Sequence, residues 1–413
     1  MNTLQIASLV VVLAGLFGAV NSIFLKLPAS IGILAVSLIA SIGVLLIDLA
    51  IPGLGIADSI RTLVNELHFS EALLEGMLGL LLFAGALHVN VSDLRKQWVV
   101  VLVMATIGVG ISTVLFGMGA VAIFGMPLIV ALVFGAIVSP TDPVAVLGVL
   151  RESDLDPTLE TQIAGESLFN DGVGYVLFLV LVGLAFPTLG EHHADGAWGP
   201  FVLFFREALG GALLGLVLGW ITFRIMRSFD DYPVEVLLTL GLAFGGYALA
   251  DAIGVSAPIA AVTAGLLIGE HGSTFAMSKQ TREAVDGFWK MVDAILNALL
   301  FMMIGFELFF VTFSGDMLLA SIAAIAMALL ARLAAVAVPV LAMRRAHDFV
   351  PGVIPIMTWG GLKGGISIAL ALSLPNSEWK PEILTATYVI VVFSILVQGL
   401  TVGRVARHYG KPA

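Results

Sequence analysis

The sequence predicts an all-α, polytopic membrane protein of about 13 transmembrane helices, arranged as inverted repeats with two broken, crossing helices. Three observations lead to this fold class. Of the 413 residues, 59% are hydrophobic and only 12% are charged, a composition too apolar for a soluble domain of this size. Apolar segments long enough to cross a bilayer recur along the whole chain. Two of them carry helix-breaking prolines or glycines at corresponding positions.

The apolar segments follow one another through short connections, and the sequence defines their ends to within a few residues. The first lacks a positively charged leader and a small-residue cleavage site, so we expect a retained span rather than a signal peptide. The ninth is short and contains Pro258, which predicts a kinked or partly spanning helix. The full set comprises residues 4–20, 30–50, 70–88, 97–124, 127–150, 161–188, 199–226, 234–252, 255–270, 289–312, 317–343, 350–374 and 383–404.

Lysine and arginine residues predict the orientation of these segments, because cytoplasmic loops of membrane proteins are enriched in both. Fourteen of them fall on one side of the predicted spans and three on the other. We therefore expect an outer N-terminus and a cytoplasmic C-terminus in a bacterial cytoplasmic membrane. The cytoplasmic set is Lys26, Arg95, Lys96, Arg151, Arg224, Arg227, Lys279, Arg282, Lys290, Arg344, Arg345, Arg404, Arg407 and Lys411, and the outer set is Arg61, Arg206 and Lys380.

Five charged side chains fall deep within the predicted spans, namely Asp142, Glu166, Asp171, Arg332 and Lys363. Charges at membrane depth are costly, and they are usually retained for an ion or proton pathway. A purely structural polar network is the alternative explanation. Three carboxylates against two cations leave one carboxylate without a compensating charge.

Two segments are predicted to be broken. In the fifth, around residues 139–143, Thr141 and Asp142 stand between two prolines, which remove backbone donors and clash with the preceding turn. In the twelfth, around residues 359–366, four glycines stand between positions 360 and 365. The twelfth segment comes seven positions after the fifth, an odd offset, so the two run in opposite directions, a pattern typical of a secondary-transporter site. Close helix packing is the alternative explanation for the glycines.

The sixth segment carries four polar side chains within two helical turns, namely Glu166, Ser167, Asn170 and Asp171. Ser167 and Asp171 are four residues apart and therefore share one face of a helix. Glu166 and Asn170 share the neighbouring face for the same reason. Together with the break in the fifth segment, these residues form the candidate ion or proton site.

Several other function classes lack their motifs. Gly165-Glu-Ser167 resembles the start of a G-x-S-x-G nucleophile elbow, but Phe169 occupies the last position, which argues against a serine hydrolase. No Walker motif is present, so we expect no nucleotide partner. The chain has no cysteine, a formal charge of −10 and no long basic run, so we expect neither a thiolate metal site nor nucleic-acid binding. We therefore expect no enzymatic activity and no cofactor.

Four motifs stand in order along the chain: Ser139-Pro-Thr-Asp-Pro143, Gly165-Glu-Ser-Leu-Phe-Asn-Asp-Gly172, Trp359-Gly-Gly-Leu-Lys-Gly-Gly365 and Val397-Gln-Gly-Leu-Thr401. Together they resemble the monovalent cation:proton antiporter family 1, the sodium/proton exchanger group, in its compact bacterial form. The resemblance covers nearly the whole chain, and its Glu-Ser-x-x-Asn-Asp element is specific. It implies thirteen spans, a six-helix core domain that moves, and a dimerisation domain, and hence membrane lipid and a second copy of the chain as partners.

The same resemblance assigns the predicted segments to domains. The dimerisation domain would contain the first three predicted spans and the eighth to tenth, and the core domain would contain the two triplets with broken helices. The assignment gives residues 1–95 and 234–312 to the dimerisation domain, 96–190 and 317–406 to the core domain, 199–228 to a linker helix and 407–413 to a short cytoplasmic tail.

Four residues would form the monovalent cation site by this resemblance. Asp171 matches the acid that binds either the cation or the proton, and Ser167 matches a side-chain ligand on the same helix. Thr141 and Asp142 match the unwound crossing, where backbone carbonyl and water-mediated contacts complete the site. The transported ions that the resemblance implies are Na⁺, or else Li⁺ or K⁺, and H⁺.

Four further residues would shape the site by resemblance. Asn170 matches the neutral partner that electrogenic relatives replace with a second aspartate, and Glu166 and Arg332 match a buried ion pair. Lys363 stands where many relatives have arginine, which keeps the charge but loses the two-pronged hydrogen bonding. Many relatives also carry an acid in the third segment, where this chain has Phe83-Ala84-Gly85.

These observations lead us to expect an antiporter in which a cation, Na⁺ first of all, competes with a proton for Asp171 and crosses by alternating access. The ends of a broken helix carry partial charges. We expect Asp142 to balance the positive ends at the crossing and Lys363 to balance the negative ends. A single exchangeable carboxylate predicts electroneutral exchange of one cation for one proton. A potassium/proton exchanger of the same fold and a cation channel are the alternatives.

Overall fold

The computed structural model describes residues 3–51, 55–66, 72–143, 146, 156–187, 199–270, 272, 277–311 and 315–410. Within these ranges the regular elements are all helices, and nine of them are long and apolar enough to cross a membrane. Predicted segments three, five, nine and twelve hold shorter helices. The predicted all-α membrane fold is therefore confirmed, and the nine long helices and the shorter ones are compatible with about 13 spans. Arg151 and Lys411 of the predicted cytoplasmic set, and most of residues 144–155, lie outside the described residues.

The described residues up to Ala252 form ten α-helices, some of them continued or preceded by a π-helical turn. They are α1 (Thr3–Val20, continued by a turn at Asn21–Leu25), α2 (Ala29–Ala50), α3 (Ile56–Glu66), α5 (Leu78–Leu87, after a turn at Ala72–Met77), α6 (Val91–Val103, continued at Met104–Gly108), α7 (Val109–Phe124), α8 (Leu128–Val138), α10 (Pro157–Ala185), α11 (Gly199–Met226) and α12 (Tyr232–Ala252).

The second half continues this helical pattern to the C-terminus. Its elements are α13 (Ala257–Leu267), α14 (Lys279–Phe306, followed by a 3₁₀ turn at Glu307–Phe309), α15 (Gly315–Met343), α16 (Val353–Trp359), α17 (Gly365–Leu372), α18 (Lys380–Phe393, continued by a π-helical turn at Ser394–Gln398) and α19 (Gly399–Tyr409).

Several helix starts lie before the predicted apolar boundaries, because the first turns of these helices are polar. Helix α10 begins at Pro157 rather than at residue 161, and the Asp156 side chain accepts a hydrogen bond from the Thr158 N–H. Helix α14 begins at Lys279 rather than at residue 289, where Ser278 caps the N–H of Thr281. The short amphipathic helix α3 was not predicted.

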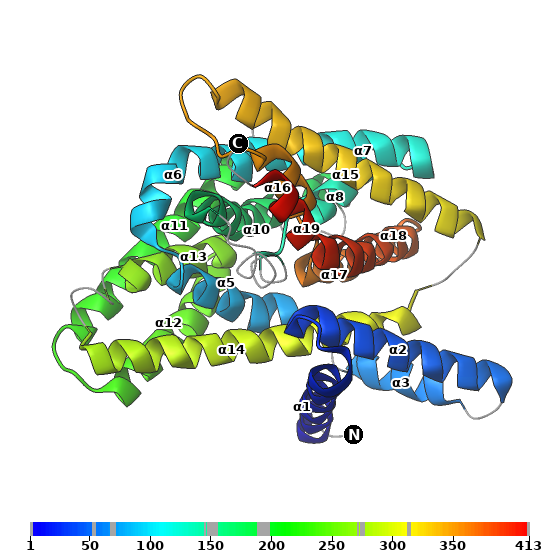
Figure 1. Ribbon diagram of the computed structural model, residues 1–413, viewed down its shortest axis with the longest axis horizontal. Helices are drawn as coiled ribbons and strands as arrows, with labels where there is room; N and C mark the ends of the chain where they lie inside the picture. The colour runs from blue at the N-terminus through cyan, green and yellow to red at the C-terminus, as the bar shows by residue number, and fades with distance from the viewer. Residues whose placement is uncertain are drawn as a thin grey trace.

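The helices pack in two groups (Figure 1). In one group, α7 packs on α8 and α15, α10 packs on α6 and α8, and α18 packs on α15 and α17. In the other group, α13 packs on α5, α11 and α12, and α14 packs on α2, α5 and α12. The first group contains both broken helices, and α10 and α17 bring it into contact with α5, α13 and α14 of the second group.

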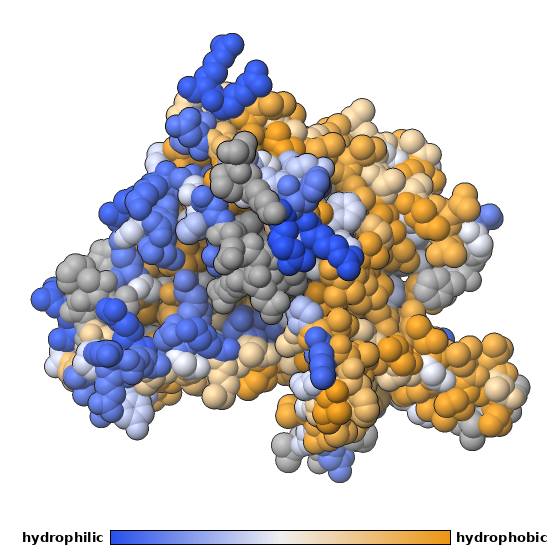
Figure 2. All heavy atoms as spheres, in the orientation of Figure 1, coloured by the Kyte–Doolittle hydropathy of each residue, from blue (hydrophilic) through white to orange (hydrophobic). Residues whose placement is uncertain are grey.

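The surface shows the polarity expected of a membrane protein (Figure 2). Hydrophobic side chains cover the part of this face over α2, α15 and α18, while hydrophilic side chains gather where α12 and α14 meet. Large exposed apolar residues occur along whole helices; on α11 they include Phe201, Phe205, Leu209, Leu213 and Trp220. Such helices are stable where lipid, rather than water, covers them.

Candidate cation site

Two interrupted helices cross near the middle of the first group. Helix α8 ends at Val138, and the following residues through Asp142 are not helical, as the two flanking prolines predict. Helix α16 ends at Trp359 and α17 begins at Gly365. The Asp142 N–H donates a 2.8 Å hydrogen bond to the Leu362 carbonyl, so the two unwound stretches pair directly. The breaks predicted around residues 139–143 and 359–366 are both present.

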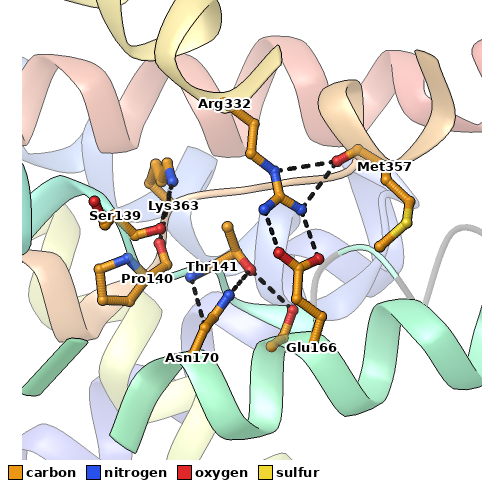
Figure 3. A network of polar contacts seen from close by, with 9 residues as sticks. Ser139, Pro140, Thr141, Glu166, Asn170, Arg332, Met357 and Lys363 are labelled. Atoms are coloured by element: carbon orange, nitrogen blue, oxygen red, sulfur yellow. Dashed lines mark hydrogen bonds and ion pairs between the residues drawn. The ribbon is translucent and has the colours of Figure 1, made fainter. Parts of the chain in front are cut away.

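Lys363 lies at the end of α8, as its predicted role requires (Figure 3). Its side chain is buried, and Nζ donates to the carbonyl oxygens of Ser139 at 3.0 Å and Pro140 at 3.3 Å. Carbonyl groups at the C-terminal end of a helix lack intrahelical donors and carry partial negative charge. The ammonium group therefore satisfies acceptors that the break would otherwise leave buried and unpaired.

Asp142 lies at the start of the other half-helix. A Cβ added to Gly364, the residue before α17, would stand 2.5 Å from Asp142 Oδ2. The carboxylate thus adjoins the positive N-terminal end of α17. Asp142 and Lys363 therefore lie at helix ends of opposite sign, in the arrangement that the sequence predicts.

Glu166 and Arg332 form the predicted ion pair between α10 and α15 (Figure 3). Arg332 Nη2 donates to Glu166 Oε2 at 2.8 Å, and Nη1 contacts the other carboxylate oxygen, so the pairing is two-pronged. Arg332 Nε and Nη2 also donate to the Met357 carbonyl at 3.3 and 3.1 Å. This pair joins α10 and α15 to the end of α16.

Asn170 and Thr141, which Figure 3 labels, form a second polar cluster with Ser167 at the first break. Asn170 Nδ2 donates to Thr141 Oγ1 at 2.8 Å, and the Thr141 N–H donates to Asn170 Oδ1 at 3.2 Å. The hydroxyl groups of Thr141 and Ser167 are 3.0 Å apart. All three side chains are buried. Through these contacts, the polar residues of α10 hold the unwound stretch around Thr141 in place.

Asp171 lies in a small cavity beside this cluster. The cavity has a volume of about 70 Å³, and Thr141 and Asp142 line it together with Asp171. Asp171 is 5% exposed, which places the carboxylate at a nearly closed position reached through this cavity. Three of the predicted site residues therefore meet around one space, whereas Ser167 approaches it through its contact with Thr141. No metal-binding group of three or more His, Cys, Asp or Glu side chains occurs within the described residues.

Sequence analysis missed several polar residues of this cavity, among them Ser367 on α17 and Asn297 and Asp293 on α14. Ser367 is 1% exposed, and its hydroxyl has no hydrogen-bond partner among the described residues. In the third predicted segment, Ala84 is fully buried and its carbonyl oxygen lies 2.7 Å from His88 Nδ1. The neighbouring Gly85 lines the small cavity, so the third segment contributes no side-chain oxygen there from these two positions.

Comparisons with known proteins agree with this geometry. The chain is 44% identical to the Na(+)/H(+) antiporter NhaP of Pseudomonas aeruginosa, over 99% of this chain and 98% of that protein. It is 34% identical to the Na(+)/H(+) antiporter NhaH of Halobacillus dabanensis, over 94% of this chain and 93% of that protein. The fold matches the sodium proton antiporter MjNhaP1 of Methanocaldococcus jannaschii with a TM-score of 0.75 at 21% identity, covering 98% of both chains. The family model for "Sodium/hydrogen exchanger, transmembrane" matches residues 8–408, and the chain belongs to this family.

Proposed function

We propose that this protein is a secondary active antiporter that exchanges Na⁺ for H⁺ across the bacterial cytoplasmic membrane by alternating access. Relatives that match almost its full length are named Na(+)/H(+) antiporters, and they do not favour the alternative of a potassium/proton exchanger. The paired broken helices favour a transporter over a channel, because matched interrupted helices in inverted halves are typical of secondary-transporter sites.

The observation that carries this proposal is the position of Asp171. Its carboxylate lies in the 70 Å³ cavity at the crossing, among oxygen-bearing side chains that suit a small alkali ion. A carboxylate binds either a proton or a cation, and the two compete for the same oxygens. Competition at one site, combined with alternating exposure to the two sides of the membrane, is sufficient for antiport.

The cation ligands that we propose are the Asp171 carboxylate and the hydroxyl groups of Thr141, Ser167 and Ser367. The three hydroxyl groups come from both triplets of the core domain, so the cation would join the two halves of the inverted repeat. Ser367 supports this set because its buried hydroxyl lines the cavity and has no partner among the described residues.

The other deep charges are held by fixed partners. Arg332 pairs with Glu166, and Lys363 donates to carbonyl oxygens at the end of α8. Asp142 adjoins the start of α17. We infer that Asp171 alone exchanges its proton, which makes the cycle electroneutral at one cation per proton.

We assign the two packing groups of helices to different roles. The group with the broken helices corresponds to the proposed core domain, residues 96–190 and 317–406, which rocks to expose the site. The group built around α5, α12 and α14 corresponds to the proposed dimerisation domain of a homodimer, with α11 as the linker helix. The bias of lysine and arginine supports an outer N-terminus and a cytoplasmic C-terminus.

The proposal is tested by proton flux in proteoliposomes that contain the purified protein. Sodium, lithium and potassium are titrated at several pH values, and the quench of an internal pH dye reports the exchange. Sodium should drive proton movement in the wild type but not in D171N, because an amide holds neither a proton nor a charge. D171N should remain folded and elute as the wild type does. Exchange by D171N at the wild-type rate would overturn the assignment of Asp171.

A further inference from the structure

Two cavities meet beside helix α14. The wider one, about 1020 Å³, is lined by residues of α5, α10 and α14, and the smaller one holds Asp171. Four residues of the described chain line both cavities, namely Gly85, Pro143, Leu168 and Asp293. Asp293 has the one ionisable side chain of these four. Its carboxylate therefore stands at the neck through which an ion would pass from the wide cavity to Asp171.

Asp293 is held at this neck by the next turn of its own helix. Asn297 is 4% exposed, and its Nδ2 donates to Asp293 Oδ1 at 3.0 Å and to the Asp293 carbonyl at 2.9 Å. Positions 293, 297 and 300 fall on one stripe of a helix, and the stripe lines the small cavity. The amide thus fixes the orientation of the carboxylate toward the passage.

Most carboxylates in the wall of the wide cavity pair with cations: Asp93 with Lys96, Glu270 with Arg95, and Glu283 with Lys279. Asp286 in its wall is bridged to Lys290 at 2.6 Å and to His88 at 2.9 Å. The described lining contains the carboxylates of Asp93, Glu160, Glu270, Glu283, Asp286 and Asp293, against the cations of Arg282 and Lys290. Both cations belong to the set predicted to face the cytoplasm, so this cavity is the cytoplasmic entrance in the proposed orientation.

Passage through the neck requires dehydration of the ion. The small cavity, at about 70 Å³, is far smaller than the wide one, at about 1020 Å³. Protein oxygens must therefore replace part of the hydration shell of a cation that enters it. A carboxylate at the entrance compensates this loss before the ion reaches Asp171.

We propose that Asp293 is a transient binding site for a partly dehydrated monovalent cation between the cytoplasmic cavity and Asp171. The inference rests on the proposed Na⁺/H⁺ exchange and adds an access step to it. Asp293 carries no transported proton in this scheme. It raises the rate at which cytoplasmic Na⁺ is captured. Transported ions reach the outer face of the protein by a different route.

The test compares the two faces of the membrane in the full-length protein. Everted vesicles expose the cytoplasmic face to added Na⁺, and right-side-out vesicles expose the outer face. In D293N, the Na⁺ concentration for half-maximal exchange should rise about tenfold at the cytoplasmic face. At the outer face it should change by less than about twofold, and the rate at saturating Na⁺ should be maintained. N297A, which keeps the charge but frees the carboxylate, should give a smaller rise at the cytoplasmic face.

Glu283 supplies the matched control, because it lies on the same helix and lines only the wide cavity, with a side chain 70% exposed. E283Q removes the same charge and should leave the half-maximal Na⁺ concentration unchanged. D293E, which keeps a carboxylate at the neck, should stay closer to the wild-type value than D293N does. Suppose that the wild type is active but the half-maximal cytoplasmic Na⁺ concentration is unchanged in D293N, or rises equally in E283Q. Either result would overturn the role of Asp293 and leave the proposed exchange standing. A wild type that moves no Na⁺ would overturn the proposed function itself.

Discussion

Two buried serines approach the small cavity from opposite halves of the chain. Ser167 on α10 contacts the Thr141 hydroxyl at 3.0 Å, whereas Ser367 on α17 lines the cavity without a partner among the described residues. A buried hydroxyl without a partner costs stability. A bound cation would satisfy it, so the two serines should respond differently to substitution.

We expect S367A to raise the half-maximal Na⁺ concentration about threefold to tenfold without lowering the melting temperature, because the hydroxyl loses no protein partner. S167A should raise it as well and should also lower the melting temperature, because the contact with Thr141 is lost. Sodium titration in proteoliposomes and thermal melting in detergent measure both effects. An unchanged sodium response in S367A would remove Ser367 from the ligand set.

Removal of Arg332 should destabilise the protein more than D171N does. R332A strands Glu166 as a buried, unpaired carboxylate, and such changes typically cost about 3–5 kcal/mol. Thermal melting should show a large loss in R332A and a partial recovery in the double variant E166Q/R332Q, whose amides are neutral. Equal melting temperatures for the single and double variants would show that the two residues are not partners in the membrane.

The sequence predicted five deep charged residues of the site, but neither Asp293 nor the neutral polar residues on α14 and α17. Glu166, Arg332 and Lys363 were found because charges at membrane depth are rare, and the structure pairs the first two and buries the third. Ser367 and Asn297 were missed because neutral polar residues are common in membrane helices, where they often serve packing. Only the folded arrangement brings them to the same cavity as Asp171.

At the scale of elements, the two unwound stretches cross with little space between them. The Asp142 N–H bonds to the Leu362 carbonyl, and Gly364 stands against the Asp142 side chain. A Cβ at Gly364 would lie 2.5 Å from Asp142 Cβ, closer than side-chain atoms approach in folded proteins. Glycine is therefore required here by the close approach of the two chains rather than by backbone conformation.

We expect G364A to force the crossing apart, with a loss of about 1–3 kcal/mol in stability and most of the exchange activity. The matched control is G110A on α7, where an added Cβ meets nothing within 4 Å. G110A should be neutral or slightly stabilising, because alanine favours helices. Thermal melting and proton flux measure both variants, and wild-type activity in G364A would show that the crossing tolerates expansion.

The breaks were predictable because proline and glycine act locally, whereas other element features were not. Pro339 lies within the continuous helix α15, so a proline in an apolar segment does not by itself mark a break. The π-helical turns at Met104–Gly108 and Ser394–Gln398 have no local sequence signal of this kind. Helix α3 was missed because long apolar runs identify spans, and this helix is short and amphipathic.

At the scale of the whole molecule, two groups of helices meet around α10, α14 and α17, where the candidate site lies. The number and order of the spans followed from hydropathy, because each span must satisfy its own backbone hydrogen bonds in lipid. The position of the wide cavity did not follow, since it depends on how α5, α10 and α14 pack around it. In the orientation proposed above, that cavity faces the cytoplasm.

The charges of the whole site determine how membrane voltage affects transport. Glu166 and Arg332 neutralise each other, and Asn170 cannot ionise. If Asp171 crosses either protonated or cation-bound, both loaded states carry the same charge. A second titrating group would allow a net charge to cross, which voltage would bias by roughly 2.3 kcal/mol per 100 mV. Lys363 is the residue to suspect in that case, because a buried lysine can lose its proton.

Sodium-driven proton flux at clamped membrane potential tests the central claim, that one carboxylate carries either Na⁺ or H⁺, most directly. Proteoliposomes are loaded with defined potassium concentrations, and valinomycin sets the potential while an internal dye reports pH. We expect the same rate and the same reversal point at every imposed voltage. The reversal point should lie where the ratio of Na⁺ to H⁺ concentration is the same inside and outside the vesicles. A reversal point that shifts with voltage would contradict the single-carboxylate cycle and would identify a second transported charge.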